Sequence, residues 1–218
     1  QFTYARFSPL LYLKDKSLIG SSKARQENMK GFIKTMLVKR LESSMVAFQE
    51  SVQRLRIGSK EFIDLYNAGR IPVGALSKKE NLASLVGMSD EDYRNYADLK
   101  QFETFTPDDF TDDFIKSVLK DDELLHQIDS IWKKFDVRKH DPKYDELKKL
   151  VKSLTPDNKI IIFSEAADTV AYLKDRLTAD FGTEVIDYSG SDNITKKRYI
   201  QDNFDPKFSY KNINDKSI

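Results

Sequence analysis

Apolar positions recur at helical spacing over most of the chain. The strongest pattern lies in the first quarter, where apolar side chains advance in steps of three and four: Met29, Phe32, Ile33, Met36, Leu37, Leu41, Met45, Phe48, Val52 and Leu55. Such spacing places them along one side of a helix. It predicts one helix from about Lys23 to Arg56 that stops at Gly58. At about 1.5 Å per residue this helix spans roughly 50 Å, a length typical of an element that connects or braces domains.

Weaker helical patterns follow this helix. Thr106-Pro107-Asp108-Asp109 has the form of a helix start, with a capping residue, a proline and acids in the first turn. Asp141-Pro142 has a similar form. The aromatic-rich segment at residues 1–22 is compatible with either a strand or irregular structure. Helices are therefore predicted at 59–76 (closed by Gly69 and Pro72), weakly at 76–99, as one or two helices at 114–135, and at 142–154.

The pattern changes at residue 159. An apolar run at 160–163 ends in Ser164, and a second run at Val185-Ile186 ends in Tyr188-Ser189-Gly190-Ser191. A helix lies between them, with Val170, Leu173, Leu177 and Phe181 as its packing face and Gly182 at its end, and a basic helix follows. A strand–helix–strand crossover of this length implies a parallel, right-handed unit. The predicted fold class is mainly α plus a partial α/β unit, with a helical region at 1–155 and a truncated parallel βαβα segment at 156–218.

Composition limits the classes of function. Lys and Arg number 36 against 35 Asp and Glu, so an anion-binding surface must be local rather than global. The absence of cysteine excludes disulfides and thiolate metal sites. No apolar stretch approaches the roughly 20 residues of a membrane span, and the start does not have the form of a signal peptide. A cytoplasmic protein with no membrane partner is expected.

Candidate chemistry lies where the two predicted strands end, which is where ligands bind in open α/β sheets. Ser164 precedes a helix, so its hydroxyl and the first free amides of that helix face an anion. In Ser189-Gly190-Ser191 the glycine allows close backbone approach to a phosphate. The basic triplet Lys196, Lys197 and Arg198 lies on the next helix and can neutralise nucleic-acid phosphates. The structural alternatives are a helix cap for Ser164, an ordinary loop for the Ser-Gly-Ser element and a solvated face for the basic triplet.

Other chemistry has little support in the sequence. The two histidines, His126 and His140, are 14 residues apart and have no metal-ligand spacing, so both are interpreted as structural or surface residues. No GxxxxGK[ST] phosphate loop, GxGxxG or GxSxG motif occurs. The acids at 108–113 are interpreted as helix-start and solvated residues. A phosphate-handling enzyme with Ser164 or Ser189 as nucleophile ranks last, because no base lies near either serine in sequence.

Two segments carry a family resemblance. The run from Lys159 through Ser164 to the YSGS element, with Arg198 and Phe204 after it, resembles the opening of the second RecA-like lobe of superfamily two helicases and Swi/Snf-type ATPases. There, a "DGS" or "HG" element stands where this chain has Ser189-Gly190-Ser191. Residues 37–48, which read LVKRLESSMVAF, resemble the "LLKRLESS…AF" helix that precedes the second lobe in a bacterial subgroup of these proteins.

The resemblance implies a parent protein that hydrolyses ATP, with Mg, to move along or remodel DNA or RNA. This chain then spans the helical region between the lobes and the start of the second lobe, and is expected to be a fragment. The Walker motifs of a first RecA-like lobe and the Thr-Asp and arginine elements that follow "NFD" are missing, so no cofactor and no catalytic residue is assigned to this chain. The resemblance implies nucleic-acid-binding roles for Ser164, Ser189, Gly190, Ser191, Lys196, Lys197 and Arg198. The alternative is a non-enzymatic helical interaction module with a small α/β cap.

Overall fold

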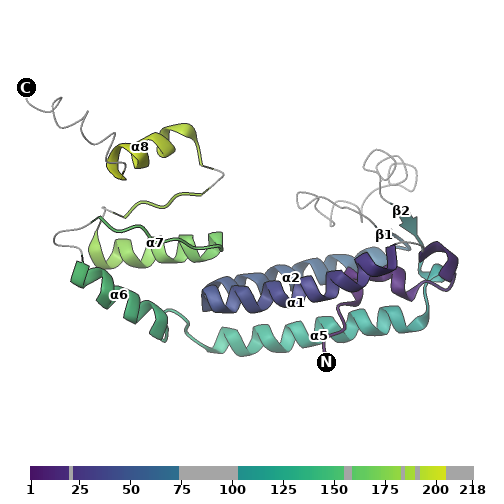
Figure 1. Cartoon of the computed structure of the whole chain (residues 1–218). Helices are drawn as coiled ribbons and strands as arrows, with labels where there is room; N and C mark the ends of the chain where they lie inside the picture. The colour runs from purple at the N-terminus through teal and green to yellow at the C-terminus, as the bar shows by residue number, and fades with distance from the viewer. Residues whose placement is uncertain (20–21, 74–102, 155–158, 183–184, 190–191, 205–218) are drawn as a thin grey trace, which may run out of the picture. The chain divides into compact units, whose positions relative to one another are not determined.

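The computed structural model describes residues 1–19, 22–73, 103–154, 159–182, 185–189 and 192–204, and these are mainly helical, as predicted (Figure 1). The chain forms two compact units, one of Gln1–Leu41 with Phe48–Asp136, the other of Glu42–Ala47 with Val137–Ile218. The boundary predicted at residues 155 and 156 falls on an undescribed stretch and stays a prediction. The described elements are α1 (Ser22–Ser43), α2 (Met45–Asn67), β1 (Ile71–Val73), β2 (Glu103–Phe105), α5 (Asp112–Lys134), α6 (Pro142–Leu154), α7 (Ala167–Phe181) and α8 (Ile194–Phe204).

The predicted single helix at 23–56 is two helices, α1 and α2, with Ser44 between them. The Ser44 hydroxyl accepts a hydrogen bond from the Ala47 amide at 3.0 Å, which caps the start of α2. Serine hydroxyls compete with the helical backbone for hydrogen bonds, so two adjacent serines favour a break. The apolar stripe did not reveal this break, because its spacing of three and four continues across Ser44 from one helix into the next.

The predicted stop at Gly58 is also wrong, since α2 continues to Asn67. A Cβ at this position would overlap Nη1 of Arg6, so the glycine leaves room for that guanidinium beside the helix. The true end of α2 is a Schellman motif around Gly69, which has φ of 77°. The Gly69 amide donates to the Tyr66 carbonyl and the Arg70 amide to the Leu65 carbonyl. Gly69 therefore closes the helix as predicted.

Residues after α2 depart from the predicted helices. β1, with Pro72 at its centre, pairs with β2 in an antiparallel two-stranded sheet. Thr106–Asp109, predicted to start a helix, forms only a 3-10 turn at Pro107–Asp109, and α5 begins at Asp112 after the Thr111 cap. α5 is one helix through to Lys134. The weak helical pattern at 76–99 lies outside the described residues.

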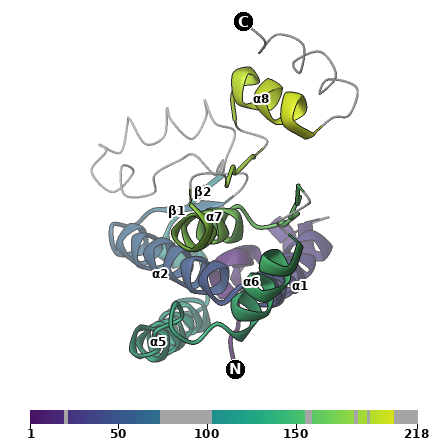
Figure 2. The same ribbon diagram turned by 90° about the vertical axis from the view of Figure 1, so that its left-hand side faces the viewer.

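The first unit has a largely aromatic core. Residues 1–19 contain three short 3-10 turns, at Ala5–Phe7, Pro9–Tyr12 and Lys16–Ile19, so this segment is irregular rather than a strand. They pack with β1 and the start of α5 around Phe114, which is fully buried. A second cluster joins α1, α2 and α5 through Leu37, Val52 and Leu125. The three helices run alongside one another (Figures 1 and 2).

A buried polar network joins α6 to α7 in the second unit. Asp141 accepts hydrogen bonds from the Tyr144 amide at 3.0 Å and from the Tyr172 hydroxyl at 2.7 Å. The Tyr144 hydroxyl donates to Asp180 at 2.6 Å. The Arg176 guanidinium lies 4.0 Å from the Tyr144 ring centroid, a cation–π contact. Asp141 thus caps α6, as its sequence predicts, and also fixes α7 against it.

Alkaline pH is expected to destabilise this unit through the two tyrosines. Burial, followed by hydrogen bonding to Asp180, raises the pKa of Tyr144, and burial with hydrogen bonding to Asp141 raises that of Tyr172. A phenol whose pKa is higher in the folded state stabilises the fold fully below the unfolded pKa of about 10. That contribution is lost as the pH rises through the folded-state pKa.

The melting temperature of the second unit, followed by circular dichroism from about pH 8 to about pH 11.5, should therefore fall above about pH 10. Tyr172→Phe should flatten the fall, because one phenol no longer ionises. Tyr199→Phe, which changes a 56 % exposed ring on α8, should leave the pH profile unchanged. Equal profiles for Tyr172→Phe and the unchanged chain would show that the buried phenol does not govern alkaline stability.

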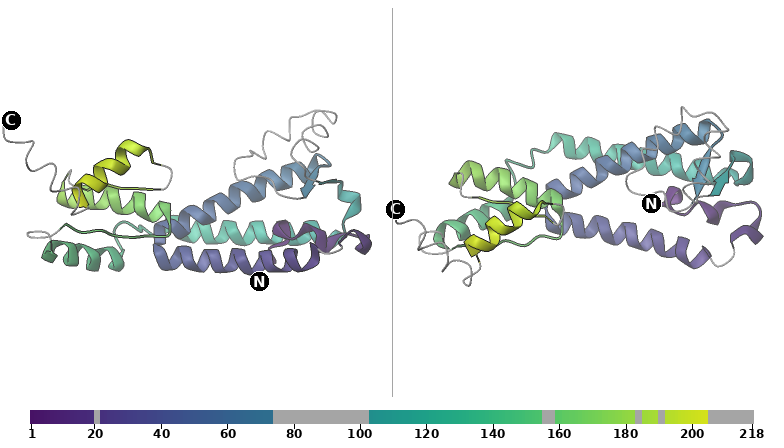
Figure 3. Two further views of the ribbon diagram at one scale, coloured as in Figure 1. Left: turned by 45° about the horizontal axis from the view of Figure 1, so that its top comes forward. Right: turned by 90° about the horizontal axis from the view of Figure 1, so that it is seen from above.

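The predicted parallel strand pair is not confirmed. Residues 160–163 and 185–188 are extended and run in the same direction on either side of the α7 connection (Figures 1 and 3), but no ladder hydrogen bonds join them. The only strand pair among the described residues is antiparallel, β1 with β2. Parallel pairs are less stable per residue than antiparallel ones, and two strands alone are too few for a stable sheet. The order extended–helix–extended–helix is nevertheless the one that the sequence predicts.

Candidate functional site

Ser164 lies at the end of the first extended segment, two residues before Ala166, which is the N-cap of α7. Its Oγ accepts a hydrogen bond from the Ala166 amide at 3.2 Å. The side chain is half-buried and also lies 3.3 Å from Oγ of Ser43. The N-cap of α7 is Ala166, which makes no side-chain cap hydrogen bond, so the helix-cap alternative for Ser164 is wrong, and its role facing an anion stays a prediction.

Four hydroxyl groups form what we call the hydroxyl cluster: Ser43, Ser44, Ser164 and Thr169. Thr169 Oγ1 lies 2.8 Å from the hydroxyl oxygens of both Ser43 and Ser44. Ser44 and Thr169 are buried, with 6 % and 4 % of their surface exposed, whereas Ser43 and Ser164 are half-buried. The cluster lies within the second unit, since residues 42–47 belong to it.

Lys143 of α6 binds the same Ser43-Ser44 corner, where α1 ends and α2 begins. Its ammonium donates to the carbonyl of Glu42 and, at 3.3 Å, to that of Ser43. These are the last carbonyls of α1, which have no partner within the helix and carry the negative end of its dipole. A cation there satisfies them. The Ser43-Ser44 corner is thus held from α7 by a hydroxyl and from α6 by a charge.

Ser189 follows the second extended segment, and its backbone is bound locally. Its amide donates to the Asp192 carboxylate at 2.6 Å, and the Asp192 amide donates to its carbonyl at 3.0 Å. Gly190 and Ser191, predicted to bind phosphate with it, lie outside the described residues. The Ser189 amide is therefore satisfied by Asp192 in this structure.

The basic triplet divides into one paired and two exposed cations. Lys196 forms ion pairs with Asp187 at 3.1 Å and Asp192 at 3.2 Å. Asp187 also pairs with Lys174 at 2.7 Å, and this hydrogen bond holds the pKa of Asp187 below its usual value despite partial burial. Lys197 and Arg198 are exposed, and neither pairs with a carboxylate among the described residues. These two cations are the ones available to a negatively charged ligand.

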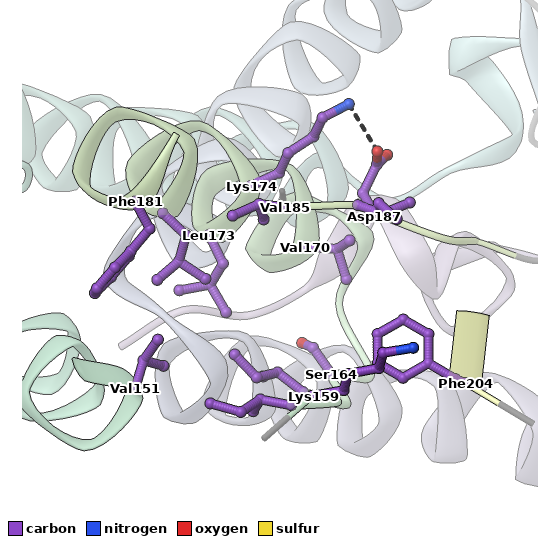
Figure 4. A pocket seen from close by; sticks show the side chains of 14 residues that line it. Val151, Lys159, Ser164, Val170, Leu173, Lys174, Phe181, Val185, Asp187 and Phe204 are labelled. Carbon is purple, nitrogen blue, oxygen red and sulfur yellow. Dashed lines mark ion pairs between the residues drawn. The ribbon is translucent and has the colours of Figure 1, made fainter. Parts of the chain in front are cut away.

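A pocket of about 300 Å³ lies between α7 and the two extended segments (Figure 4). Val170, Leu173 and Phe181 of α7 form one wall, and Val151 of α6 and Val185 contribute to the others. Ser164 and the Lys174–Asp187 ion pair provide its polar groups. The packing face predicted for α7 is therefore correct, and it lines a pocket that two unpaired segments leave incompletely filled.

Sequence reasoning missed three residues of the hydroxyl cluster and the acids that bind Lys196. Ser43 and Ser44 are visible in the LESS motif, where paired serines inside an apolar stripe indicate a cap. Thr169 gives no comparable signal, because a threonine in the first turn of a helix is common. The i, i+4 spacing of Asp192 and Lys196 does predict their ion pair.

The comparisons and the remaining chemistry add no further assignment. Comparison with models of protein families, with curated proteins and with solved structures gave no match. Within the described residues, no group of three or more His, Asp or Glu side chains is placed to hold a metal ion. No helix in the described part of the chain is both long and apolar enough to cross a membrane.

Proposed function

We propose that this chain is part of a nucleic-acid-dependent ATPase of the helicase type. It provides the helical brace between the two motor lobes and the first part of the second lobe, and it contacts the phosphate backbone without hydrolysing ATP. One observation carries the proposal. The two segments that resemble this family are far apart in sequence, and their serines, Ser43 and Ser164, lie 3.3 Å apart. Two chance matches to one family would not be expected to lie next to each other in the folded chain.

The second unit supports a RecA-like identity in its order of elements. Each extended segment is followed by a small polar residue and then by a helix. Ile160 and Ile162 face the α7 side, where they line the pocket, whereas Ile161 and Phe163 are 57 % and 90 % exposed. Parallel sheets are covered on both faces, so apolar residues on both sides of a segment suit a strand inside such a sheet. We place ATP and Mg²⁺ in the parent's other motor lobe, because this sequence has no phosphate loop.

Charge favours α8 as the main contact in the proposed nucleic-acid complex. Lys197 and Arg198 are exposed there, whereas the half-buried Ser164 is flanked by Glu165 and has Asp168 one turn on. These carboxylates repel a phosphate, so a neutral hydroxyl contributes one hydrogen bond rather than the bulk of the affinity. The affinity must come from the cations, and it must fall as salt rises.

Reversing both charges, in Lys197→Glu with Arg198→Glu, is expected to weaken binding of a fluorescein-labelled 20-nucleotide DNA or RNA at least about tenfold at low salt. The logarithmic salt slope should become shallower by about 1.4 to 1.8, because two phosphate contacts are lost. Fluorescence anisotropy across a salt series measures both quantities. The matched control is Lys116→Glu with Lys120→Glu, which makes the same charge change on the exposed face of α5. This control should bind as the unchanged chain does. It would weaken binding as much as the α8 reversal only if binding depends on net charge alone.

The alternative is a non-enzymatic interaction module, favoured by the exposed apolar side chains Ile161, Phe163 and Tyr188. No binding of single-stranded or duplex DNA or RNA at low salt, together with a stable protein partner recovered through these side chains, would establish it in place of the helicase proposal. Equal weakening by the α5 and α8 reversals would instead show that the α8 contact map is wrong.

A further inference from the structure

We propose that Thr169 and Ser43 are positioning residues, which hold the Ser164 hydroxyl as an outward hydrogen-bond donor to a nucleic-acid phosphate oxygen. The inference rests on the proposed function and assigns a role to two residues for which the resemblance implies none. It follows from counting donors and acceptors in the hydroxyl cluster.

The cluster is a continuous chain of hydrogen bonds. It begins at the Ala47 amide, which donates to Ser44 at 3.0 Å. It continues from Ser44 to Thr169 and from Thr169 to Ser43, each at 2.8 Å. It ends at Ser164, 3.3 Å beyond Ser43. The start of α2 is thereby linked to the start of α7.

The number of protons leaves one hydroxyl that must donate outside the cluster. Each hydroxyl has one proton to donate and two lone pairs that accept. The four hydroxyls contribute four protons, and the three links between them use three. At the two ends, the Ala47 and Ala166 amides donate into the cluster and so use lone pairs, not protons. One hydroxyl proton must therefore point out of the cluster.

Burial and cooperativity place that proton on Ser164. Ser44 and Thr169 are buried, and their hydroxyls contact no acceptor outside the cluster among the described residues. Donation in one direction, from Ser44 through Thr169 and Ser43 to Ser164, polarises each hydroxyl in turn and strengthens the chain. Among the described residues this proton is donated to the Ala166 carbonyl over a long 3.4 Å, and the same oxygen also accepts from the Val170 amide. A phosphate oxygen is a stronger acceptor than this long contact.

Binding to the labelled 20-nucleotide DNA or RNA tests the inference in the full chain. Ser164→Ala should weaken binding about tenfold, the effect of one hydrogen bond to a charged group. Thr169→Val breaks the chain in its middle without changing side-chain size, and it should weaken binding severalfold. Combining the two should weaken binding no further than Ser164→Ala alone, because Thr169 acts through Ser164. Thr169→Ser, which retains a hydroxyl, should bind as the unchanged chain does.

Thr178→Val is the matched control on the same helix. The Thr178 hydroxyl is buried but has no hydrogen-bond partner, so its removal should leave binding unchanged. Ser43→Ala, at a half-buried position, replaces Thr169→Val if that variant does not fold.

Each outcome separates the inference from the proposed function. Additive losses from Thr169→Val and Ser164→Ala, or unchanged binding by Thr169→Val, would overturn the positioning role while leaving the phosphate contact in place. No effect of Ser164→Ala, with weakening by the α8 charge reversal, would remove Ser164 from the contact map and the positioning role with it. A chain that binds neither DNA nor RNA would overturn both the inference and the function on which it rests.

Discussion

Replacing Phe114 with alanine is expected to lower the free energy of unfolding of the first unit by about 4 kcal/mol. Phe114 is fully buried and stacks on Phe110 with ring centroids 4.5 Å apart. It also meets Phe62 edge-on at 5.9 Å and lies 5.4 Å from Tyr12. The substitution leaves a cavity and removes several aromatic pairs, each of which contributes about 0.5 to 1.5 kcal/mol beyond burial.

Phe114 matters this much because it joins segments that are distant in sequence. The rings around it come from the N-terminal turns, from α2 and from the residues before α5. The N-terminal segment has no core of its own, since residues 1–19 form only short 3-10 turns. Loss of the central ring should therefore loosen the N-terminal segment as well as α5.

Urea denaturation followed by fluorescence of Trp132, the chain's single tryptophan, measures this effect in the first unit. The tryptophan lies on α5 and packs against Phe48 at 5.4 Å. Phe32→Ala, the same change at a ring that is 63 % exposed, should alter the free energy by no more than about 0.5 kcal/mol. A loss below about 1.5 kcal/mol for Phe114→Ala would show that the core refills around the missing ring.

Elements whose limits are set by local chemistry were predictable from the sequence. α6 begins after Asp141, α7 ends at Gly182 and α2 closes around Gly69, each with a residue that suits the position for a stated physical reason. The break at Ser44 and the continuation of α2 past Gly58 were not predictable from the sequence. An apolar stripe records which side of a helix is buried and contains no information on whether the axis is continuous. A Cβ at position 58 would overlap the guanidinium of Arg6, which lies 52 positions away in sequence.

In the candidate site, too, local features were predictable and contacts between distant residues were not. Sequence placed Ser164 and the basic triplet at the starts of α7 and α8, because strand ends and helix starts are local features. It could not show that Asp187 pairs with Lys196 while Lys197 and Arg198 stay exposed. It also could not bring Ser43 to Thr169, which is 126 positions away. The extended segments were expected to pair as parallel strands, but a parallel pair is less stable per residue than an antiparallel one, and no further strand pairs with either segment among the described residues.

Asp121→Ala is expected to lower the free energy of unfolding by about 3 kcal/mol, roughly a hundredfold in the unfolding equilibrium. Asp121 lies on α5 with 5 % of its surface exposed. Its carboxylate accepts hydrogen bonds from the Thr3 amide at 2.6 Å, the Thr3 hydroxyl at 2.8 Å and the Ala5 amide at 3.1 Å. Alanine would leave the amide of Ala5, a fully buried residue, without a partner.

The expected loss reaches beyond one carboxylate because these bonds fasten the N-terminal turns that cover Phe114. Asp121→Asn should lose about half as much, because its one carbonyl oxygen can accept from some of the three donors while its NH₂ cannot. Glu123→Ala, two residues along on the exposed side of α5, should change stability by no more than about 0.5 kcal/mol. Trp132 fluorescence in urea gives the free energies, and hydrogen exchange of the Ala5 amide reports the anchor directly. Unchanged exchange at Ala5 in Asp121→Ala would mean that the N-terminal turns are held by apolar packing alone.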